Sequence, residues 1–415
     1  MKKIIINGGK PLEGEILISG SKNSALPIIC ASLLCRDVVK LYNVPNIEDI
    51  KNLISILEEL GVSVKWENKT LIIDSSQIKD MPIQSEKVSK LRASYYLMGV
   101  YLGLFNKVLI NMPGGCDLGA RPIDLHLKSF KRLNCNYLVE EDQVNITAKQ
   151  IIPTKIFLDI PSVGATINIM LSTVLADGIT SIENAAKEPE IVDVANFLNK
   201  MGAKISGAGS GVIQIEGVKE FHSAEHSIIY DRIEAGTYIL MAATNCIEVD
   251  IINFDFHHNS ALISKLIESN IKFRLYENKI KILSSPDLLP IELKTNYFPG
   301  FPTDLQQVYL ALLTKAKGVS SVQDNIYQSR FKNCYELNKM NARIIVEQNL
   351  ASIFGPRNLI GTEVNATDLR GGASLVLAGL LAEGETIINH AEHIFRGYSG
   401  IIDKIRKING NIRLV

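Results

Sequence analysis

The sequence is built from a repeat of about 70 residues that occurs six times along its 415 residues. Each copy opens with a segment rich in small and apolar residues. These segments begin near Ser21, Arg92, Ser162, Asp231, Phe301 and Ala366. Helices that are apolar on nearly every face are buried on most faces, so we expect these six to be the inner helices of the fold.

A second helix in each copy ends in a constant way. In the first copy, Ile50, Leu53 and Leu57 fall on one side of this helix, which predicts an amphipathic, outer helix. The residue that ends each second helix is glycine or asparagine: Gly61, Asn134, Gly202, Asn270, Asn341 and Asn409. These two residue types tolerate the positive φ of a helix C-terminus. With short β-branched strands around the helices, one copy reads β-α-β-α-β-β.

The six copies divide most simply into three plus three, although no Pro-, Ser- or Gly-rich linker marks the division. The boundary then falls near Tyr230. Two strand-like runs, Ile4–Ile6 and Glu15–Ile18, precede the first copy and could complete the last one. We therefore expect an α/β protein with two similar domains, formed by residues 21–229 and by residues 1–20 with 230–415.

The charge balance excludes a global basic surface. Lysine plus arginine and aspartate plus glutamate number 44 each, so neither nucleic acid nor a membrane surface is an expected partner. The longest apolar run, Tyr95–Phe105, is too short to span a membrane. The six cysteines form no CxxC pair, which predicts reduced thiols in a cytoplasmic protein rather than disulfides or zinc.

The loop Pro113–Pro122 carries three glycines around Cys116, followed by Arg121. Glycine allows a segment to move and to approach a ligand closely. A thiol on such a loop beside a cation is suited to chemistry. The alternative is an ordinary surface loop with an incidental cysteine. If the functional interpretation holds, the loop is a mobile lid.

The starts of the inner helices predict an anionic ligand, because helix N-termini expose unpaired N–H groups and a positive dipole end. Capping alone explains the serines and threonines found there. It does not explain Lys22 and Arg92, whose charge opposes the dipole. With Arg121 and Arg396 in short glycine-containing loops, a polyanionic substrate is expected.

Two further motifs carry little functional weight. Gly207–Gly211 resembles half of a dinucleotide-binding motif, but a strand follows it, so we predict a hairpin turn. The pairs His390/His393 and His222/His226 lack a third ligand at useful spacing, so no metal site is predicted.

Several segments together resemble the UDP-N-acetylglucosamine 1-carboxyvinyltransferase family of enolpyruvyl transferases. They are residues 20–27, 92–94, 114–125, 162–165, 183–192, 231–236, 301–304, 330–331, 367–370 and 396–398. The resemblance runs from end to end. It implies two similar inside-out α/β domains, each of three βαβαββ units, with the active site in the interdomain cleft.

The resemblance also implies an activity. A member of this family transfers the enolpyruvyl group of phosphoenolpyruvate to the 3′-hydroxyl of UDP-N-acetylglucosamine and releases phosphate, in the first committed step of peptidoglycan synthesis. It implies neither a metal nor an organic cofactor, and no obligate protein partner.

The family pattern assigns roles to matched positions of this chain. Cys116 would be the acid that protonates the methylene carbon, Asp304 the base or orienting group for the sugar hydroxyl, and Lys22 and Arg396 the remaining catalytic residues. Phosphoenolpyruvate would be held by Lys22, Asn23, Arg121 and Arg396. The nucleotide-sugar would contact Asn23, Arg92, Arg121, Pro122, Ile123, Asp124, Leu125, Ser162, Val163, Gly164, Asp304 and Ile326. The second-line members of the site would be Arg330, Asp368, Arg370 and His393.

Two features qualify the resemblance. Ile160-Pro161 stands where family members often carry a basic residue, which puts one nucleotide contact in doubt. Cysteine at position 116 predicts inactivation by fosfomycin, which alkylates this thiol in the family.

Three alternatives stay open: a 3-phosphoshikimate 1-carboxyvinyltransferase, a paralogue acting on another uridine nucleotide, and an inactive binding protein on the same fold. Retention of Lys22, Cys116, Asp304 and Arg396 argues against the last.

Overall fold

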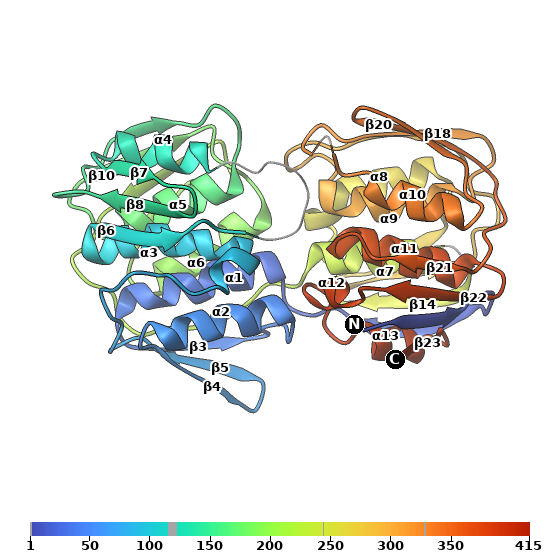
Figure 1. Cartoon of the computed structure of the whole chain (residues 1–415), viewed down its shortest axis with the longest axis horizontal. Coiled ribbons are helices and arrows are strands. Elements are labelled where there is room, and N and C mark those ends of the chain that lie inside the picture. Colours follow the sequence, from blue (N-terminus) through green and yellow to red (C-terminus); the bar gives the residue numbers. More distant parts are fainter. Residues whose placement is uncertain (1, 115–122, 244, 328) are drawn as a thin grey trace. The chain divides into compact units, whose positions relative to one another are not determined.

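The computed structural model describes residues 2–114, 123–243, 245–327 and 329–415. The described chain forms two compact units (Figure 1). One runs from Gly20 to Ile229 and is called the Lys22 unit below. The other joins the residues up to Ser19 with those from Tyr230 onward and is called the Asp304 unit.

The Lys22 unit contains three inner helices that pack against one another and are buried on most faces: α1 (Lys22–Ala31), α3 (Tyr96–Phe105) and α5 (Val163–Thr173). Its second helices are amphipathic: α2 (Glu48–Glu59), α4 (Asp124–Arg132) and α6 (Pro189–Lys200). Its strands are β3 (Val38–Tyr42), β4 (Ser63–Glu67), β5 (Thr70–Asp74), β6 (Lys107–Asn111), β7 (Asn136–Val139), β8 (Gln143–Thr147), β9 (Lys155–Phe157), β10 (Ile179–Glu183), β11 (Lys204–Ser206), β12 (Val212–Glu216) and β13 (Glu225–Ser227).

The Asp304 unit repeats this plan. Its inner helices are α7 (Arg232–Ala242), α9 (Thr303–Leu313) and α11 (Leu369–Leu381). Its other helices are α8 (Ser260–Glu268), α10 (Lys332–Lys339), α12 (Glu392–Phe395) and α13 (Ile401–Lys407). Its strands are β1 (Ile4–Asn7), β2 (Leu12–Leu17), β14 (Cys246–Ile252), β15 (Phe273–Leu275), β16 (Lys279–Leu283), β17 (Glu292–Lys294), β18 (Val319–Gln323), β19 (Ile344–Glu347), β20 (Leu350–Phe354), β21 (Glu363–Asn365), β22 (Glu385–Asn389) and β23 (Asn411–Leu414).

The third copy shows the repeat in full. It runs β9, α5, β10, α6, β11, β12, and its sheet has the strand order β11-β12-β10-β9. Strand β9 is parallel to β10, and the other neighbours are antiparallel. Strand residues alternate between buried and exposed, as in β12, so each sheet has one buried face and one exposed face. The apolar inner helices lie beneath these sheets (Figure 1), and the predicted inside-out α/β class is confirmed.

The residues predicted to end the second helices do so in all six copies. Each has the expected positive φ: Gly61 86°, Asn134 70°, Gly202 108°, Asn270 59°, Asn341 69° and Asn409 66°. The segment Gly207–Gly211 joins β11 to β12, so the predicted hairpin turn is also confirmed.

The first strand of a copy does not always precede it in sequence. In the first copy, β3 pairs with β13, and in the fourth copy β14 pairs with β2. The second copy has only a bridge between Ile83 and Ile110 at this place. Strand β1 lies between β22 and β23 and fills the last sheet. Each unit therefore closes its own sheets with strands from distant parts of its own chain.

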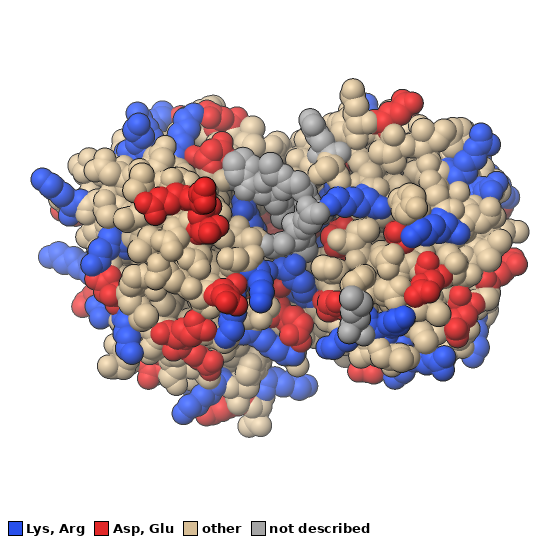
Figure 2. Space-filling model, viewed as in Figure 1, with Lys and Arg blue, Asp and Glu red and all other residues tan. Residues whose placement is uncertain are grey.

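The surface carries no large field of one sign in the view of Figure 2. Acidic and basic side chains are interspersed on the visible face of each unit, in line with a net charge of +0. Among the described residues, no helix is both long and apolar enough to cross a bilayer.

Candidate active site

Asp304 is the centre of a charged cluster in the Asp304 unit. It lies in the first turn of α9, where its carboxylate meets two arginines. Arg330 Nη2 lies 2.8 Å from Oδ1, and Arg370 Nη2 lies 3.0 Å from Oδ2. The arginine side chains are 3% exposed, whereas that of Asp304 is 27% exposed. The cluster therefore exposes the Asp304 carboxylate, a hydrogen-bond acceptor, and buries the two guanidinium groups.

The charge state of Asp304 follows from these neighbours. Burial by itself would raise the pKa of the carboxyl, but Arg370 and Arg330 outweigh it and hold the pKa well below its ordinary value. Asp304 is therefore a permanent anion, able only to accept hydrogen bonds. This favours orienting a hydroxyl over acting as a strong base.

Neutral side chains hold Arg330 in place. Its Nη1 donates to Thr303 Oγ1 at 2.9 Å, and its Nε donates to Gln307 Oε1 at 3.3 Å. Gln307 in turn donates to Asp368 Oδ2 at 3.1 Å. The other oxygen of Asp368 caps α11 by accepting from the backbone N–H groups of Arg370 and Gly371. The first turns of α9 and α11 are thus linked side chain to side chain.

The segment after α12 also contacts the start of α11. The Arg370 guanidinium lies over the ring of Tyr398, 5.1 Å from its centroid, and Tyr398 is 1% exposed. The Tyr398 hydroxyl is 2.9 Å from Thr237 Oγ1 on α7. A Cβ on Gly397 would lie 2.7 Å from Leu369 Cδ2, so this chain passes close to the helix. Arg396 and His393 thereby belong to the same region as Asp304, and burial together with the charge of Arg396 lowers the pKa of His393.

In the Lys22 unit, Lys22 meets a carboxylate that sequence reasoning missed. Its Nζ lies 2.7 Å from Asp49 Oδ2, and the two side chains are 13% and 4% exposed. Ser21 caps α1 through the Ser24 backbone N–H. Asp49 had no distinctive signal, because an acidic residue in the first turn of a helix such as α2 is ordinary.

A second group in this unit forms where α3, α4 and α5 meet. Arg92 donates from Nη1 to the Pro113 carbonyl at 3.2 Å and lies over the Tyr95 ring. The rings of Tyr95 and His126 are 5.0 Å apart. A Cβ on Gly164 would lie 2.6 Å from His126 Nε2, so glycine is needed at this point of α5. Burial and the charge of Arg92 lower the pKa of His126 to about 3.

The remaining predicted nucleotide residues that the structure describes lie at the starts of α1, α4 and α5 and, in the Asp304 unit, after β18. Ile123 is buried just before α4, Asp124 is exposed in its first turn, and Leu125 is half-buried. Ser162 caps α5 by accepting from the Ala165 N–H, and Val163 follows it. Asn23 is half-buried in the first turn of α1, and Ile326 is half-buried in the Asp304 unit. Cys116, Arg121 and Pro122, with the predicted lid itself, lie outside the described residues.

Gly114, the last described residue before that segment, has a steric role. A Cβ there would lie 1.4 Å from the Ser89 carbonyl oxygen, and its N–H donates to the Val88 carbonyl at 3.3 Å. The entry to the segment is therefore fixed against residues 88–92, beside Arg92.

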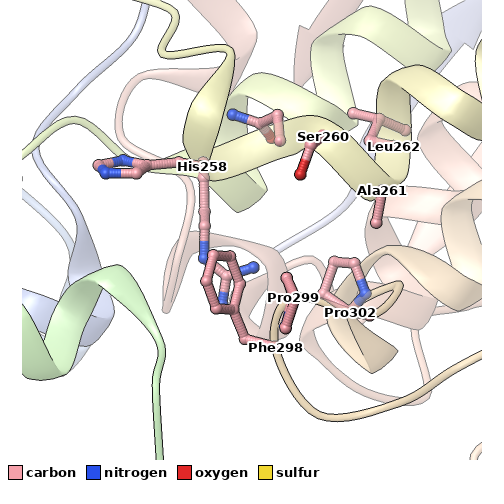
Figure 3. A pocket seen from close by; sticks show the side chains of 10 residues that line it. His258, Ser260, Ala261, Leu262, Phe298, Pro299 and Pro302 are labelled. Atoms are coloured by element: carbon pink, nitrogen blue, oxygen red, sulfur yellow. The ribbon is translucent and has the colours of Figure 1, made fainter. Parts of the chain in front are cut away.

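The Asp304 unit also contains a small pocket next to α8. Phe298, Pro299 and Pro302 face Ser260 and Ala261 at the start of α8 (Figure 3). Its volume is about 10 Å³, room for about one water molecule. Among the described residues, no three His, Cys, Asp or Glu side chains are grouped to hold a metal.

The fold defines the class of protein. A family model described as EPSP synthase (3-phosphoshikimate 1-carboxyvinyltransferase) matches residues 6–405. The enolpyruvyl transferase NikO from Streptomyces tendae has a TM-score of 0.91 at 23% identity, covering 100% of this chain and 99% of that one. EPSP synthase from Acinetobacter baumannii has a TM-score of 0.76 at 16% identity, with 100% of both chains covered. The chain is thus of the enolpyruvyl transferase class.

Sequence relatives narrow the class. The chain is 49% identical over 410 residues to UDP-N-acetylglucosamine 1-carboxyvinyltransferase 2 of Listeria monocytogenes, which covers 99% of this chain and 97% of that protein. It is 48% identical over 412 residues to the protein of the same name from Geobacillus kaustophilus, covering 99% and 96%. The chain belongs to the UDP-N-acetylglucosamine 1-carboxyvinyltransferase family.

Proposed function

We propose that this enzyme transfers the enolpyruvyl group of phosphoenolpyruvate to the 3′-hydroxyl of UDP-N-acetylglucosamine and releases inorganic phosphate. The observation that carries the proposal is the Asp304 carboxylate, ionised and partly exposed between the buried guanidinium groups of Arg330 and Arg370. A sugar hydroxyl needs an acceptor of this kind to direct its oxygen toward a carbon.

The reaction proceeds by addition and elimination. The sugar oxygen bonds to C2 of phosphoenolpyruvate while a proton is delivered to C3, and the hydroxyl proton is released. The tetrahedral intermediate then loses a C3 proton and the phosphate leaves from C2. Asp304 orients the hydroxyl in the first step, and Cys116 supplies the proton to C3 as the family pattern implies.

The cations have a matching role. Phosphoenolpyruvate brings a phosphate and a carboxylate, and charge-assisted hydrogen bonds from lysine and arginine are strong partners for both. Lys22, Arg121 and Arg396 hold this substrate. Lys22 is held by Asp49 at 2.7 Å, which fixes its position before substrate arrives. No metal or organic cofactor is required by these groups.

Residues of the Lys22 unit bind the nucleotide-sugar. Arg92, Ser162–Gly164 and Ile123–Leu125 gather around α3, α4 and α5, where a helix N-terminus can receive a diphosphate. The proposed compartment is the cytoplasm, as the sequence predicts from cysteines that form no CxxC pair.

Sugar-dependent phosphate release tests the proposal. The purified protein is incubated with phosphoenolpyruvate and either UDP-N-acetylglucosamine, another uridine diphosphate sugar, or 3-phosphoshikimate. Release only with UDP-N-acetylglucosamine is expected. Preferential release with another acceptor would refute this substrate assignment, and no release with any acceptor would refute catalysis.

A further inference from the structure

Asp324, directly after β18, is completely buried, and sequence reasoning assigned it no role. Four donors from the described residues point at its two carboxylate oxygens. Oδ1 accepts from Thr295 Oγ1 at 2.8 Å and from the backbone N–H groups of Ile326 at 2.8 Å and Tyr327 at 2.9 Å. Oδ2 accepts from Thr303 Oγ1 at 2.6 Å. An aspartate that only stabilised a turn would need just the Oδ1 contacts.

This position differs from its equivalents in other copies. In two of the other five copies, the residue after the strand that corresponds to β18 is Met112 or His390. In the remaining three it is Asn43, Asn184 or Asn253, and each of these has a positive φ. Their side-chain amides donate to the carbonyl after the neighbouring first strand, as Asn184 does to Leu158 at 2.8 Å. In the copy that contains β18, Asp324 stands directly after the strand and the asparagine comes one residue later, as Asn325. The Asn325 side-chain amide donates to the Thr295 carbonyl at 3.2 Å. The turn that has an asparagine directly after the strand in those three copies therefore has a carboxylate at this position in the β18 copy.

The two oxygens of Asp324 lead to two different parts of the candidate site. Oδ1 sets the turn that carries Ile326. Oδ2 orients the Thr303 hydroxyl, whose single proton goes to Asp324 and whose lone pair then accepts from Arg330 Nη1 at 2.9 Å. Arg330 in turn lies 2.8 Å from Asp304 Oδ1.

We propose that Asp324 is a positioning residue for the transfer reaction, setting Ile326 through one oxygen and Asp304 through Thr303 and Arg330 with the other. The inference rests on the proposed function, in which Ile326 contacts the nucleotide-sugar and Asp304 orients its hydroxyl. Only a carboxylate satisfies all four donors. In Asp324→Asn, the new NH2 group faces either Thr303 or the two backbone N–H groups, so one branch loses its hydrogen bonds, and the neutral amide oxygen is a weaker acceptor for the other branch.

Steady-state kinetics of three single variants and one double variant separates the two branches. Asp324→Asn should lower kcat by roughly 10- to 100-fold and raise KM for UDP-N-acetylglucosamine several-fold, with KM for phosphoenolpyruvate unchanged. Thr303→Val cuts only the branch to Arg330 and should lower kcat without raising KM for the nucleotide-sugar. Thr303→Ser keeps the hydroxyl and should restore wild-type kcat. In the double variant Asp324→Asn/Thr303→Val, kcat should fall no further than in Asp324→Asn.

Controls make each outcome decisive. Asp250→Asn removes a mostly buried carboxylate of the same unit, paired with Lys279, and should leave kcat and both KM values unchanged. Thermal unfolding monitors folding, and Thr303→Val tests the Arg330 branch even if Asp324→Asn does not fold. Wild-type kinetics in Asp324→Asn or Thr303→Val would overturn the inference alone. A wild-type protein without sugar-dependent phosphate release would overturn the proposed function as well.

Discussion

Lys22 and Asp49 form a close ion pair, with 2.7 Å between Nζ and Oδ2, although they begin two different helices. Lysine at a helix N-terminus opposes the dipole, and Asp49 compensates for that cost. The pair thus keeps a cation at a place where phosphoenolpyruvate is proposed to bind.

Asp49→Asn should therefore weaken both folding and catalysis. Removing one partner of a mostly buried pair leaves Lys22 without this counter-charge, at a cost of about 3 kcal/mol in the free energy of unfolding. We expect kcat/KM for phosphoenolpyruvate to fall roughly tenfold as Lys22 loses its fixed position. Denaturant unfolding and initial rates measure the two effects. Glu48→Gln, on the exposed side of the same helix turn, should change neither value.

Asp304→Asn should have a larger effect on catalysis. The amide keeps the shape but removes the charge that two buried arginines share. We expect kcat to drop about 100-fold or more, and the unfolding free energy to drop by about 3 kcal/mol, at the low end for a buried pair because Asp304 is partly exposed. Asp287→Asn, at a surface ion pair with Lys317, is the control. An unchanged kcat in Asp304→Asn would remove Asp304 from the reaction.

The stability of the folded protein should fall with acidification because of His126. Its pKa is about 3 when folded and near 6.5 when unfolded, so within this window the unfolded chain binds a proton that the folded chain does not. The His126 contribution is thus complete above pH 6.5 and is lost as the pH falls toward 3, by at most about 1.4 kcal/mol per pH unit. His126→Gln should flatten the dependence of unfolding free energy on pH between 6.5 and 4. The exposed His222→Gln should retain the wild-type slope.

Gly114→Ala tests the entry to the glycine-rich segment. The added methyl would meet the Ser89 carbonyl at 1.4 Å, so the backbone must move away from residues 88–92. We expect kcat/KM to fall at least tenfold with little change in the unfolding midpoint, because a loop and not the core is displaced. Gly211→Ala has 3.7 Å to its nearest neighbour and should be neutral. Equal effects of the two substitutions would contradict this steric role.

Thiol reactivity should be confined to Cys116. The five described cysteines, Cys30, Cys35, Cys135, Cys246 and Cys334, all have raised pKa values, chiefly because of burial. Raised pKa values keep thiols protonated and unreactive at neutral pH. Fosfomycin should add one group, at Cys116, and none to Cys116→Ser, as measured by intact mass and peptide mapping. Labelling at Cys35 would contradict the prediction.

The sequence predicted those features that depend on local chemistry. Six helix ends follow from the backbone freedom of glycine and asparagine, and six inner helices follow from apolar residues on every face. The pairing of β13 with β3 and of β2 with β14 could not be predicted from local patterns, because each joins segments that are far apart in sequence.

Some residues of the candidate site could likewise be predicted from the sequence, and others could not. Asp304, Arg330 and Arg370 were recognised from motifs, and the structure brings them together. Asp49, His126 and Asp324 were missed because an acid at a helix start, a histidine in an amphipathic helix and an aspartate after a strand are all ordinary in sequence. Their buried surroundings become visible only in the fold.

The pairing of β1 has a consequence for how the chain is made. Ile4 pairs with Ile388 and Leu414, so this strand leaves the ribosome long before its partners exist. All described residues of the Lys22 unit, in contrast, lie between Gly20 and Ile229, so this unit can fold before the rest of the Asp304 unit is synthesised. The N-terminal strands must then stay unpaired through translation of the entire inserted unit, and a nascent chain stalled before β22 would expose them to chaperones and proteases.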